Sequence, residues 1–461
     1  MNILFDRISD TIAAIATSLG RGGIAIVRVS GDLAGEIAGK VFRPFKSPKR
    51  LKHRIMTYGH AIAPDESPID EGLAVFFRGP NSYTTQDVLE IHCHGGSEMA
   101  RQVLSSCMAA GARLAEPGEF TKRAFLNGRI DLSQAEAVMR IISAKSEKAA
   151  RLSQKQLDGA LSKEITSLQS DLLDIMAGIE AAADYPEEDV DDMTLRQTFD
   201  RILSIYAALD RLLKSADYAK KLRDGIRICI AGKPNAGKSS LMNALLGENR
   251  AIVTDIAGTT RDILTEPLNI NGIPATICDT AGLRAGAETE GDVIERIGIE
   301  RARAEIQSAD IVLLVWDMGE EFTDEDRRII DLDKPMILVK NKTDLFGEGE
   351  AFIPSDVEIP SVTVSALTLQ GIDELKQMLS SMFEESDSLG DASLTEERHV
   401  ASVKSARKAL GLALAAIEAG MPVDVCAIDL RDAWHHLGLI TGKTADDELI
   451  SRIFESFCLG K

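Results

Sequence analysis

The sequence predicts a multidomain chain: an α+β domain comes first, and an α/β domain is inserted into an all-α domain. Three observations support this architecture. The chain has 461 residues, which is too many for one ordinary hydrophobic core. Strand-like runs alternate with helical stretches in residues 220–384, and helical patterns lie on both sides of that segment. The predicted domains are residues 1–127, 128–219, 220–384 and 385–461, of which the second and fourth form one helical domain.

The N-terminal segment is expected to form a compact α+β unit. Short strand-like runs occur at residues 24–29, 72–77 and 88–92. Glycine and proline residues separate these runs and indicate turns between them.

The central segment is expected to consist of long helices. Between Leu132 and Leu222 there is one proline, Pro186. Apolar residues recur there at alternating spacings of three and four, as in Ile165, Leu168, Leu172, Ile175 and Ile179. The acidic run at 184–192 is expected to be a solvated turn rather than a binding patch, because so many acids cannot be buried without partners.

The inserted α/β segment carries a phosphate-binding loop. Residues 232–239 read Gly-Lys-Pro-Asn-Ala-Gly-Lys-Ser and directly follow the strand-like run Ile226 to Ala231. The glycines let backbone N–H groups turn toward a triphosphate, Lys238 can reach its β and γ oxygens, and Ser239 can ligate Mg²⁺. The loop alone does not identify the nucleotide.

Two further elements suit the γ-phosphate. Residues 258–262 read Gly-Thr-Thr-Arg-Asp, and Thr260 is expected to complete the Mg²⁺ coordination. Asp279 closes a strand-like run and is followed by Thr280, Ala281 and Gly282, so that a carboxylate stands behind the metal and a glycine can sense the γ-phosphate.

Two more elements suit the base. Residues 341–344 read Asn-Lys-Thr-Asp after a strand-like run, and Asp344 can accept hydrogen bonds from the N1–H and exocyclic amine of guanine. Residues 365–367 read Ser-Ala-Leu and can offer a backbone N–H to the guanine carbonyl. Since adenine lacks that donor pair, the sequence predicts a GTP site of the Ras-like P-loop class.

The group that orients the attacking water is not evident. Leu283 stands where Ras-like proteins carry the glutamine that does this, and leucine cannot replace it. The local polar candidates are Arg284, Glu288, Glu290, Asp292 and Glu295, each of which could equally be a solvated loop charge.

Composition limits the other functions. The formal net charge of −20 argues against a surface that binds nucleic acid over its whole extent, so any RNA contact is expected to be local or supplied by a partner. The six cysteines form no C-x-x-C pair, which argues against a disulfide framework or a zinc ribbon. With no basic leader and no apolar run long enough to cross a membrane, the protein is expected in the cytoplasm.

Several short motifs make the chain resemble the tRNA-modification GTPase family MnmE, also called TrmE, over its whole length. They are Gly20-Arg21-Gly22-Gly23, Pro80-Asn81-Ser82-Tyr83-Thr84, His92-Cys93-His94-Gly95-Gly96, Pro117-Gly118-Glu119-Phe120 and the terminal Phe457-Cys458-Leu459-Gly460-Lys461.

The resemblance implies a tetrahydrofolate-binding N-terminal domain that also drives homodimerisation. It implies a heterotetramer with the FAD-carrying flavoprotein MnmG (GidA), which would hold most of the tRNA. Together the pair would use the carbon of a 5-formyl- or 5,10-methylene-tetrahydrofolate to add an aminomethyl or carboxymethylaminomethyl group to carbon 5 of the wobble uridine. GTP hydrolysis would drive conformational change.

The resemblance also implies site residues. Folate contacts fall on Arg28, Glu90, Arg129 and Lys461; Arg129 stands where lysine is common, and Arg28 with Glu90 could also be a simple surface ion pair. A K⁺ ion that replaces an arginine finger would be held by Asn235, Thr254, Thr259 and the carbonyl of Ile256, and Glu295 would orient water. The residues expected to contact GTP are Asn235, Ala236, Gly237, Lys238, Ser239, Ser240, Thr254, Asp255, Ile256, Ala257, Gly258, Thr259, Thr260, Asp279, Thr280, Ala281, Gly282, Asn341, Lys342, Thr343, Asp344, Ser365, Ala366 and Leu367.

Two further positions carry open alternatives. Cys458 follows an apolar stripe that should bury the last helix, and its thiol could be a nucleophile activated by Lys461 or a small packing residue. His92 and His94 lie two apart, but no third ligand completes a metal site there.

Two other functions share the same nucleotide motifs. One is a ribosome- or RNA-associated GTPase switch of the Era or Der type, which would carry a basic KH-like domain instead of the N-terminal unit and the Cys-x-Gly-Lys end. The other is a folate-dependent carbon-transfer enzyme whose GTPase domain only regulates it.

Overall fold

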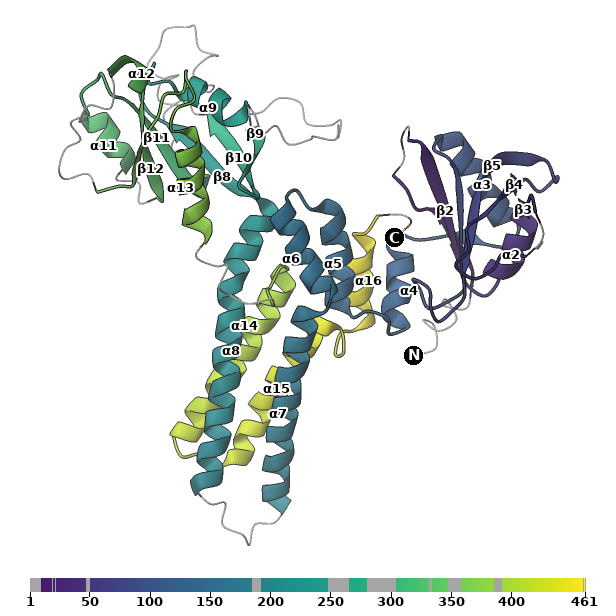
Figure 1. Ribbon diagram of the computed structural model, residues 1–461. Coiled ribbons are helices and arrows are strands. Elements are labelled where there is room, and N and C mark those ends of the chain that lie inside the picture. The colour runs from purple at the N-terminus through teal and green to yellow at the C-terminus, as the bar shows by residue number, and fades with distance from the viewer. Residues whose placement is uncertain are drawn as a thin grey trace. The chain divides into compact units, whose positions relative to one another are not determined.

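The computed structural model describes residues 10–18, 20, 22–46, 50–184, 192–247, 265–279, 304–330, 334–346, 358–384, 392–458 and 460. Its contacts divide the chain into two compact units (Figure 1). The first unit comprises Met1–Met139, Gln156–Arg201 and Lys408–Lys461, and the second Arg140–Lys155 and Ile202–Arg407.

The first unit contains a seven-stranded sheet with the spatial order β3-β4-β5-β6-β2-β1-β7. Its neighbouring strands are antiparallel except for β1 and β7. The strands are β1 (Ile12–Ile15), β2 (Ile24–Ser30), β3 (Phe42–Pro44), β4 (Thr57–Ile62), β5 (Pro68–Phe77), β6 (Val88–His94) and β7 (Arg113–Leu114).

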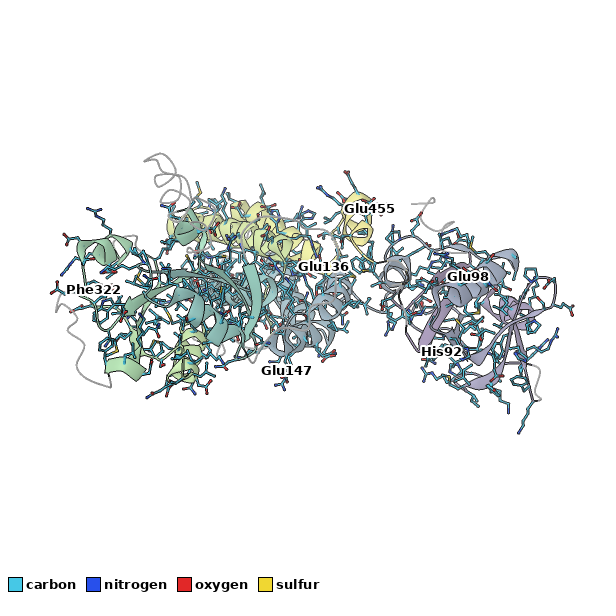
Figure 2. The ribbon with its side chains drawn as sticks, turned by 90° about the horizontal axis from the view of Figure 1, so that it is seen from above. His92, Glu98, Glu136, Glu147, Phe322 and Glu455 are labelled. Atoms are coloured by element: carbon cyan, nitrogen blue, oxygen red, sulfur yellow. The ribbon has the colours of Figure 1, made fainter. Side chains whose placement is uncertain are left out.

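The two faces of this sheet differ. Alternate residues such as Val27, Val29 and Ile91 are buried in a core shared with residues of helices α2 (Ala34–Val41) and α3 (Ser97–Ala109). Their neighbours in sequence point to the other face, and in Figure 2 His92 lies on the side of the sheet away from Glu98 of α3. Among the described residues, helix α4 (Glu119–Leu126) covers that second face near β1, while large apolar side chains elsewhere on it stay exposed.

Two helices of the first unit carry apolar stripes that the sequence predicts. Besides α2 and α3, the helices that lie entirely within this unit are α4, α7 (Ala160–Asp184), α15 (Val423–Thr441) and α16 (Asp447–Glu455). The predicted α7 stripe is buried throughout, and α7 runs beside α15, where Gln169 Nε2 donates to the Trp434 carbonyl at 3.1 Å. The stripe of the last helix is also confirmed: Ile450, Phe454 and Phe457 are buried in one cluster.

The second unit contains a six-stranded sheet with the order β13-β12-β11-β8-β10-β9. All neighbouring strands are parallel except β10 and the edge strand β9. The strands are β8 (Ile226–Ala231), β9 (Thr265–Ile270), β10 (Ile273–Asp279), β11 (Ile311–Asp317), β12 (Met336–Asn341) and β13 (Ser361–Thr363).

Apolar clusters cover both faces of this second sheet, as expected for a parallel sheet. One cluster includes residues of α9 (Lys238–Leu246) and α13 (Ile372–Glu384), which lie beside the sheet in Figure 1. The other helices are α5 (Leu132–Ser143), α6 (Glu147–Leu157), α8 (Asp192–Asp224), α11 (Asp324–Ile330), α12 (Thr343–Phe346) and α14 (Glu397–Glu418). No helix in the described part of the chain is long and apolar enough to cross a membrane.

Candidate nucleotide site and N-terminal site

The phosphate-binding loop lies between β8 and α9, at the carboxyl edge of the parallel sheet. Gly232 (φ +139°) and Gly237 (φ +95°) have backbone conformations that side chains rarely adopt. A Cβ atom would lie 2.2 Å from the Val315 carbonyl at Gly232 and 2.1 Å from Asn341 Nδ2 at Gly237. Asn235 is also left-handed, with φ +62°. Both glycines are therefore needed for the loop to pack directly against β11 and β12.

Lys238 directs its amine into this loop. Its Nζ donates to the carbonyls of Gly232 at 2.9 Å and Lys233 at 2.6 Å, and the residue is buried. The ammonium group is thus placed where it can reach the oxygens of a bound triphosphate. Ser239, the predicted Mg²⁺ ligand, lies in the first turn of α9, whose N-terminus favours anions.

Asn341, the last residue of β12, links two other loops at this edge. Its Nδ2 donates to the Ala236 carbonyl at 2.9 Å, and its Oδ1 accepts from the Ala366 N–H at 3.1 Å. Asn341 is buried, so these bonds are shielded from water. A single side chain therefore holds the phosphate loop and the segment after β13 in place.

Asp344 is oriented by the same segment. Its Oδ1 accepts a 2.6 Å hydrogen bond from the Ser365 hydroxyl, which itself accepts from the Thr368 N–H at 3.1 Å. Asp344 and Leu367 are exposed. The carboxylate is thus fixed at one oxygen and open to solvent, as recognition of two donors on a guanine edge requires.

Two ion pairs of this site were not predicted from the sequence. Lys342 (φ +72°) pairs with Asp317 at 2.6 Å, and Lys233 pairs with Asp326 at 2.8 Å. Both carboxylates are buried. The available signal was that Asp317 ends an apolar run and therefore reaches the same sheet edge as the other motifs.

Part of the predicted nucleotide site lies outside the described residues. The structure describes Asp279 as the last residue of β10, but not its side chain. The predicted positions outside the described residues are Thr254, Asp255, Ile256, Ala257, Gly258, Thr259, Thr260, Thr280, Ala281, Gly282, Glu295 and Lys461.

In the first unit, Arg28 and Glu90 face each other on neighbouring strands β2 and β6. Arg28 Nε lies 2.9 Å from Glu90 Oε1, and each side chain is 18% exposed, so this is an ion pair shielded from much of the solvent. Burial acts to raise the pKa of the Glu90 carboxyl, but the neighbouring His92 ring and Arg28 outweigh it and hold that pKa below its usual value. Glu90 is therefore ionised at neutral pH.

Tyr83 brings the two predicted folate-site arginines together. The Arg28 guanidinium lies 5.4 Å from the Tyr83 ring centroid, and that of Arg129 lies 4.8 Å from it. Arg129 also donates to the Tyr83 carbonyl at 3.1 Å, and the Tyr83 hydroxyl lies 2.9 Å from that of Thr121. The Tyr83 ring thus lies beside both Arg28 and Arg129, and Glu90 joins this group through its ion pair with Arg28. The buried Nε2 of His92 lies 3.8 Å from Glu90 Oε2 and makes no closer hydrogen bond among the described residues.

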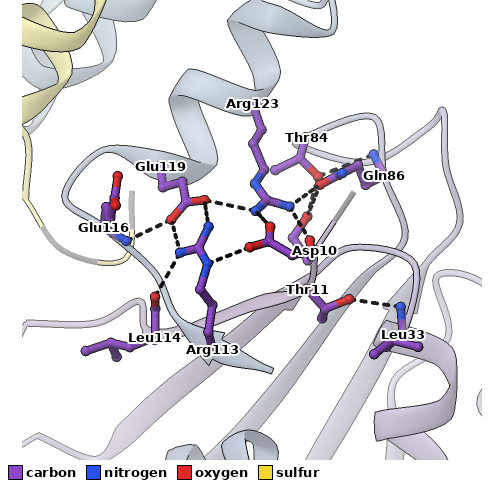
Figure 3. Close-up of polar contacts among 11 residues, drawn as sticks. Asp10, Thr11, Leu33, Thr84, Gln86, Arg113, Leu114, Glu116, Glu119 and Arg123 are labelled. Carbon is purple, nitrogen blue, oxygen red and sulfur yellow. Dashed lines mark hydrogen bonds and ion pairs between the residues drawn. The ribbon is translucent and has the colours of Figure 1, made fainter. Parts of the chain in front are cut away.

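A network of hydrogen bonds around two arginines, Arg113 and the buried Arg123, reaches the loop that contains Thr84 and Gln86 (Figure 3). Arg123 is 2% exposed and donates to Asp10, Glu119 and Gln86 at 2.5, 2.9 and 3.0 Å. Arg113 donates to the same two carboxylates, at 2.6 Å to each. The network joins β7, α4 and the loop before β6, and so fixes the loop that carries Tyr83.

The C-terminal motif packs against this N-terminal unit. Gly118 (φ +66°) donates its N–H to the Cys458 carbonyl at 3.3 Å, and a Cβ atom there would lie 2.7 Å from Phe457 Cβ. At Gly460, a Cβ atom would lie 2.2 Å from the Ile15 carbonyl. The Cys458 side chain is exposed, contrary to the packing interpretation, whereas the other five cysteines are buried.

The glycine motifs at 20–23 and 92–96 meet at a cavity of about 200 Å³. His94 Nδ1 lies 2.8 Å from Asp70 Oδ1, so the partner of His94 is Asp70 and not His92. No group of three or more metal-ligating side chains occurs among the described residues.

Comparison with known proteins accounts for both units. The family model for the MnmE helical domain matches residues 132–458, and that for the GTP-binding protein TrmE N-terminus matches residues 11–129. The tRNA modification GTPase MnmE of Geobacillus kaustophilus is 47% identical, with 98% of this chain and 99% of the relative covered. That of Ligilactobacillus salivarius is 44% identical, with 98% of each chain covered.

Among solved structures, Aquifex aeolicus Era bound to GDP and AlF4⁻ is 30% identical over 41% of this chain and 67% of its own, with a TM-score of 0.28. That score is too low to support a structural argument. The matches at 44% and 47% identity, which run over nearly the whole chain, show that it belongs to the MnmE (TrmE) family of tRNA modification GTPases.

Proposed function

We propose that this protein is a K⁺-dependent GTPase that acts with the flavoprotein MnmG (GidA) in modifying the wobble uridine of certain tRNAs. The observation that carries the proposal is the nucleotide site of a chain in a family of tRNA modification GTPases: Asn341 and Asp344 are fixed for guanine beside a phosphate loop that contains Lys238. Hydrolysis of GTP to GDP and phosphate is the enzymatic step of this chain.

Ser239 and Asn235 of the phosphate loop, together with Thr260 of the segment 258–262, are proposed cation-binding side chains. Mg²⁺ prefers oxygen ligands, which the hydroxyls of Ser239 and Thr260 supply. Asn235 is exposed and left-handed, and its neutral amide oxygen suits a monovalent cation. With Thr254, Thr259 and the Ile256 carbonyl, it would hold K⁺ beside the β and γ phosphates, where positive charge stabilises the transition state.

Glu295 is the proposed group that orients the attacking water. Leu283 has no polar atom and cannot do so, and a carboxylate can accept a hydrogen bond from that water.

The N-terminal unit is the proposed site of a tetrahydrofolate derivative, 5-formyl- or 5,10-methylene-tetrahydrofolate. The ionised Glu90 suits the donor groups of a pterin ring, and Arg28, Arg129 and Lys461 suit its glutamyl carboxylates. The half-buried Tyr83 ring and the His92 ring beside Glu90 fit a polar aromatic ligand there. Bound there, the folate would supply a one-carbon group. Cys458, in the same compact part of the chain, offers an exposed thiol that could act as a nucleophile.

The same unit is the proposed homodimer interface. Ile24 and Leu73 are exposed on the face of the sheet opposite α2 and α3, and such apolar surface favours association with a second copy. The flavoprotein partner would contribute FAD and hold most of the tRNA in a heterotetramer.

GTP turnover in K⁺ and Na⁺ at equal ionic strength tests the catalytic part of this proposal. We expect a rate in K⁺ at least about tenfold higher, because a developing negative charge is neutralised only when the ion fits the loop. Replacing Asn235 by glycine removes the amide oxygen without straining the backbone at φ +62° and should abolish the difference while GDP binding persists. Asn243→Ala, at an exposed asparagine of α9, is the matched control. Equal wild-type rates in both salts would rule out the K⁺ site.

A further inference from the structure

The N-terminal unit contains a strongly basic segment in an otherwise acidic chain. Residues 37–64 contain no Asp or Glu but seven Lys or Arg, whereas the whole chain has a net charge of −20. Such segregation creates a local positive potential that the net charge conceals. The nucleotide and folate sites described above use none of these cations.

Apart from Lys40 on α2, the described cations of this segment lie at one end of the N-terminal sheet, where β3 is the edge strand. We call this surface the basic edge; it comprises Arg43, Lys46, Arg50, Lys52, Arg54 and Arg78, all exposed. Arg78 joins it because its N–H donates to His53 Nδ1 at 3.0 Å.

Most charges of the basic edge lack an acidic partner. Arg43 lies 3.4 Å from Glu66, but both side chains are mostly exposed, so that pair is weak. Within the described ranges, the other five cations form no salt bridge, and Arg54 donates to the Asn81 carbonyl at 3.0 Å. Glu71, which accepts a hydrogen bond from the Tyr58 hydroxyl, is a second carboxylate that borders the surface. The surplus charge is therefore positive and available to an anionic partner.

Exposed aromatic rings lie beside these cations. Phe45 is 48% exposed and Tyr58 52% exposed, and their ring centroids are 4.7 Å apart. The His60 ring lies 4.5 Å from that of Phe45. Exposed rings next to unpaired cations are the arrangement that binds single-stranded nucleic acid, because bases stack on the rings while the cations neutralise phosphates.

We propose that the basic edge, with Phe45 and Tyr58, binds a single-stranded segment of RNA. This inference rests on the proposed function, which makes tRNA the substrate. An anionic membrane would also attract the cations, but it would not need the cluster of rings. The RNA contact would be local, which reconciles it with the acidic charge of the whole chain.

The test compares two triple variants of the full-length chain by fluorescence anisotropy with a labelled anticodon stem-loop RNA. Lys46→Glu/Arg50→Glu/Lys52→Glu alters exposed residues of the basic edge, and Arg211→Glu/Lys214→Glu/Lys404→Glu makes the same charge change on exposed helical positions. Each single-stranded phosphate contact contributes roughly 0.7 to the slope of log K against log salt. We therefore expect the first variant to bind at least about tenfold more weakly at low salt, with a slope smaller by about 2. The second variant should bind like the wild type.

Phe45→Leu isolates the stacking contribution, since it keeps an apolar side chain of similar size. It should weaken RNA binding by about tenfold without changing the salt slope. GTP turnover and dimer mass should be unchanged in both the triple basic-edge variant and Phe45→Leu, which shows that the fold is retained.

Three results would overturn this inference. The wild-type chain could show no measurable RNA binding, or the two triple variants could bind RNA with equal affinity. The third result is that the basic-edge variant loses binding to phosphatidylserine vesicles while its RNA binding stays intact. Mass spectrometry of tRNA nucleosides separates this failure from failure of the proposed function. If the wild-type chain supports wobble-uridine modification in cells but the basic-edge variant binds RNA normally, only the surface assignment is wrong.

Discussion

Replacing Asn341 by alanine tests whether one buried side chain holds the nucleotide loops together. The change removes a 2.9 Å bond to the Ala236 carbonyl and a 3.1 Å bond from the Ala366 N–H. A buried polar group left without its partner costs roughly 1–3 kcal/mol, so the two losses amount to about 2–6 kcal/mol. If GDP binding must supply the lower of these free energies, about 2 kcal/mol, in order to reorder the loops, the affinity for GDP falls at least about thirtyfold.

The assay is calorimetric titration of the full-length variant with GDP, with urea unfolding as a check of the fold. Asn269→Ala is the matched control, because Asn269 also accepts one backbone hydrogen bond, from Gly272 at 2.8 Å, in the same unit. It should lower stability by about 1 kcal/mol and leave GDP affinity unchanged. If folded Asn341→Ala bound GDP as tightly as the wild type, the role of Asn341 in organising the loops would be refuted.

Two further predictions concern the N-terminal unit. Burial acts to raise the pKa of Glu119, but its bonds from two arginines and a backbone N–H outweigh it and lower that pKa. The stabilisation is therefore present above the ordinary pKa of about 4.3 and is lost as the pH falls through the lower folded value. Glu119→Gln should lower the free energy of unfolding by about 3 kcal/mol at neutral pH, because the charge of buried Arg123 is then less compensated. Urea unfolding should show that the stability difference between wild type and variant narrows toward pH ~3. A stability difference that stays constant with pH would contradict this prediction. Gly118→Ala should loosen the C-terminal segment to proteases and cost about 2–3 kcal/mol, because the residue is left-handed and its Cβ would overlap Phe457. Gly128→Ala is the control, because Gly128 has φ +72° with open space around it and so carries the same backbone strain without the overlap. Equal protease sensitivity of the two variants would count against the packing of Gly118 on Phe457.

Local patterns predict much of this fold because they act within one element. The strand-like run Ile226–Ala231 forms β8 with the predicted bounds, and the apolar stripe of α7 is buried throughout. The phosphate loop follows from a motif whose glycines have conformations that other residues avoid. The ends of elements are less well predicted: the strand expected at 72–77 begins at Pro68.

Contacts between distant residues could not be predicted in the same way. The partner of Lys342 is Asp317, and the partner of Lys233 is Asp326, 93 positions further along the chain. The buried Arg123 network likewise depends on strand pairing, which single residues do not encode. The family resemblance selected Arg28, Glu90 and Arg129, but the ring of Tyr83 that joins the two arginines became visible only in the structure.

The wobble nucleosides of tRNA test the central claim most directly. We predict that mass spectrometry of tRNA from cells lacking this chain shows loss of the modified wobble uridine, and that the wild-type gene restores it. The Asn341→Ala variant should restore it only in part, because its GTP site is weakened. Unchanged wobble uridines in cells without the chain would contradict the account and favour an RNA-associated GTPase switch.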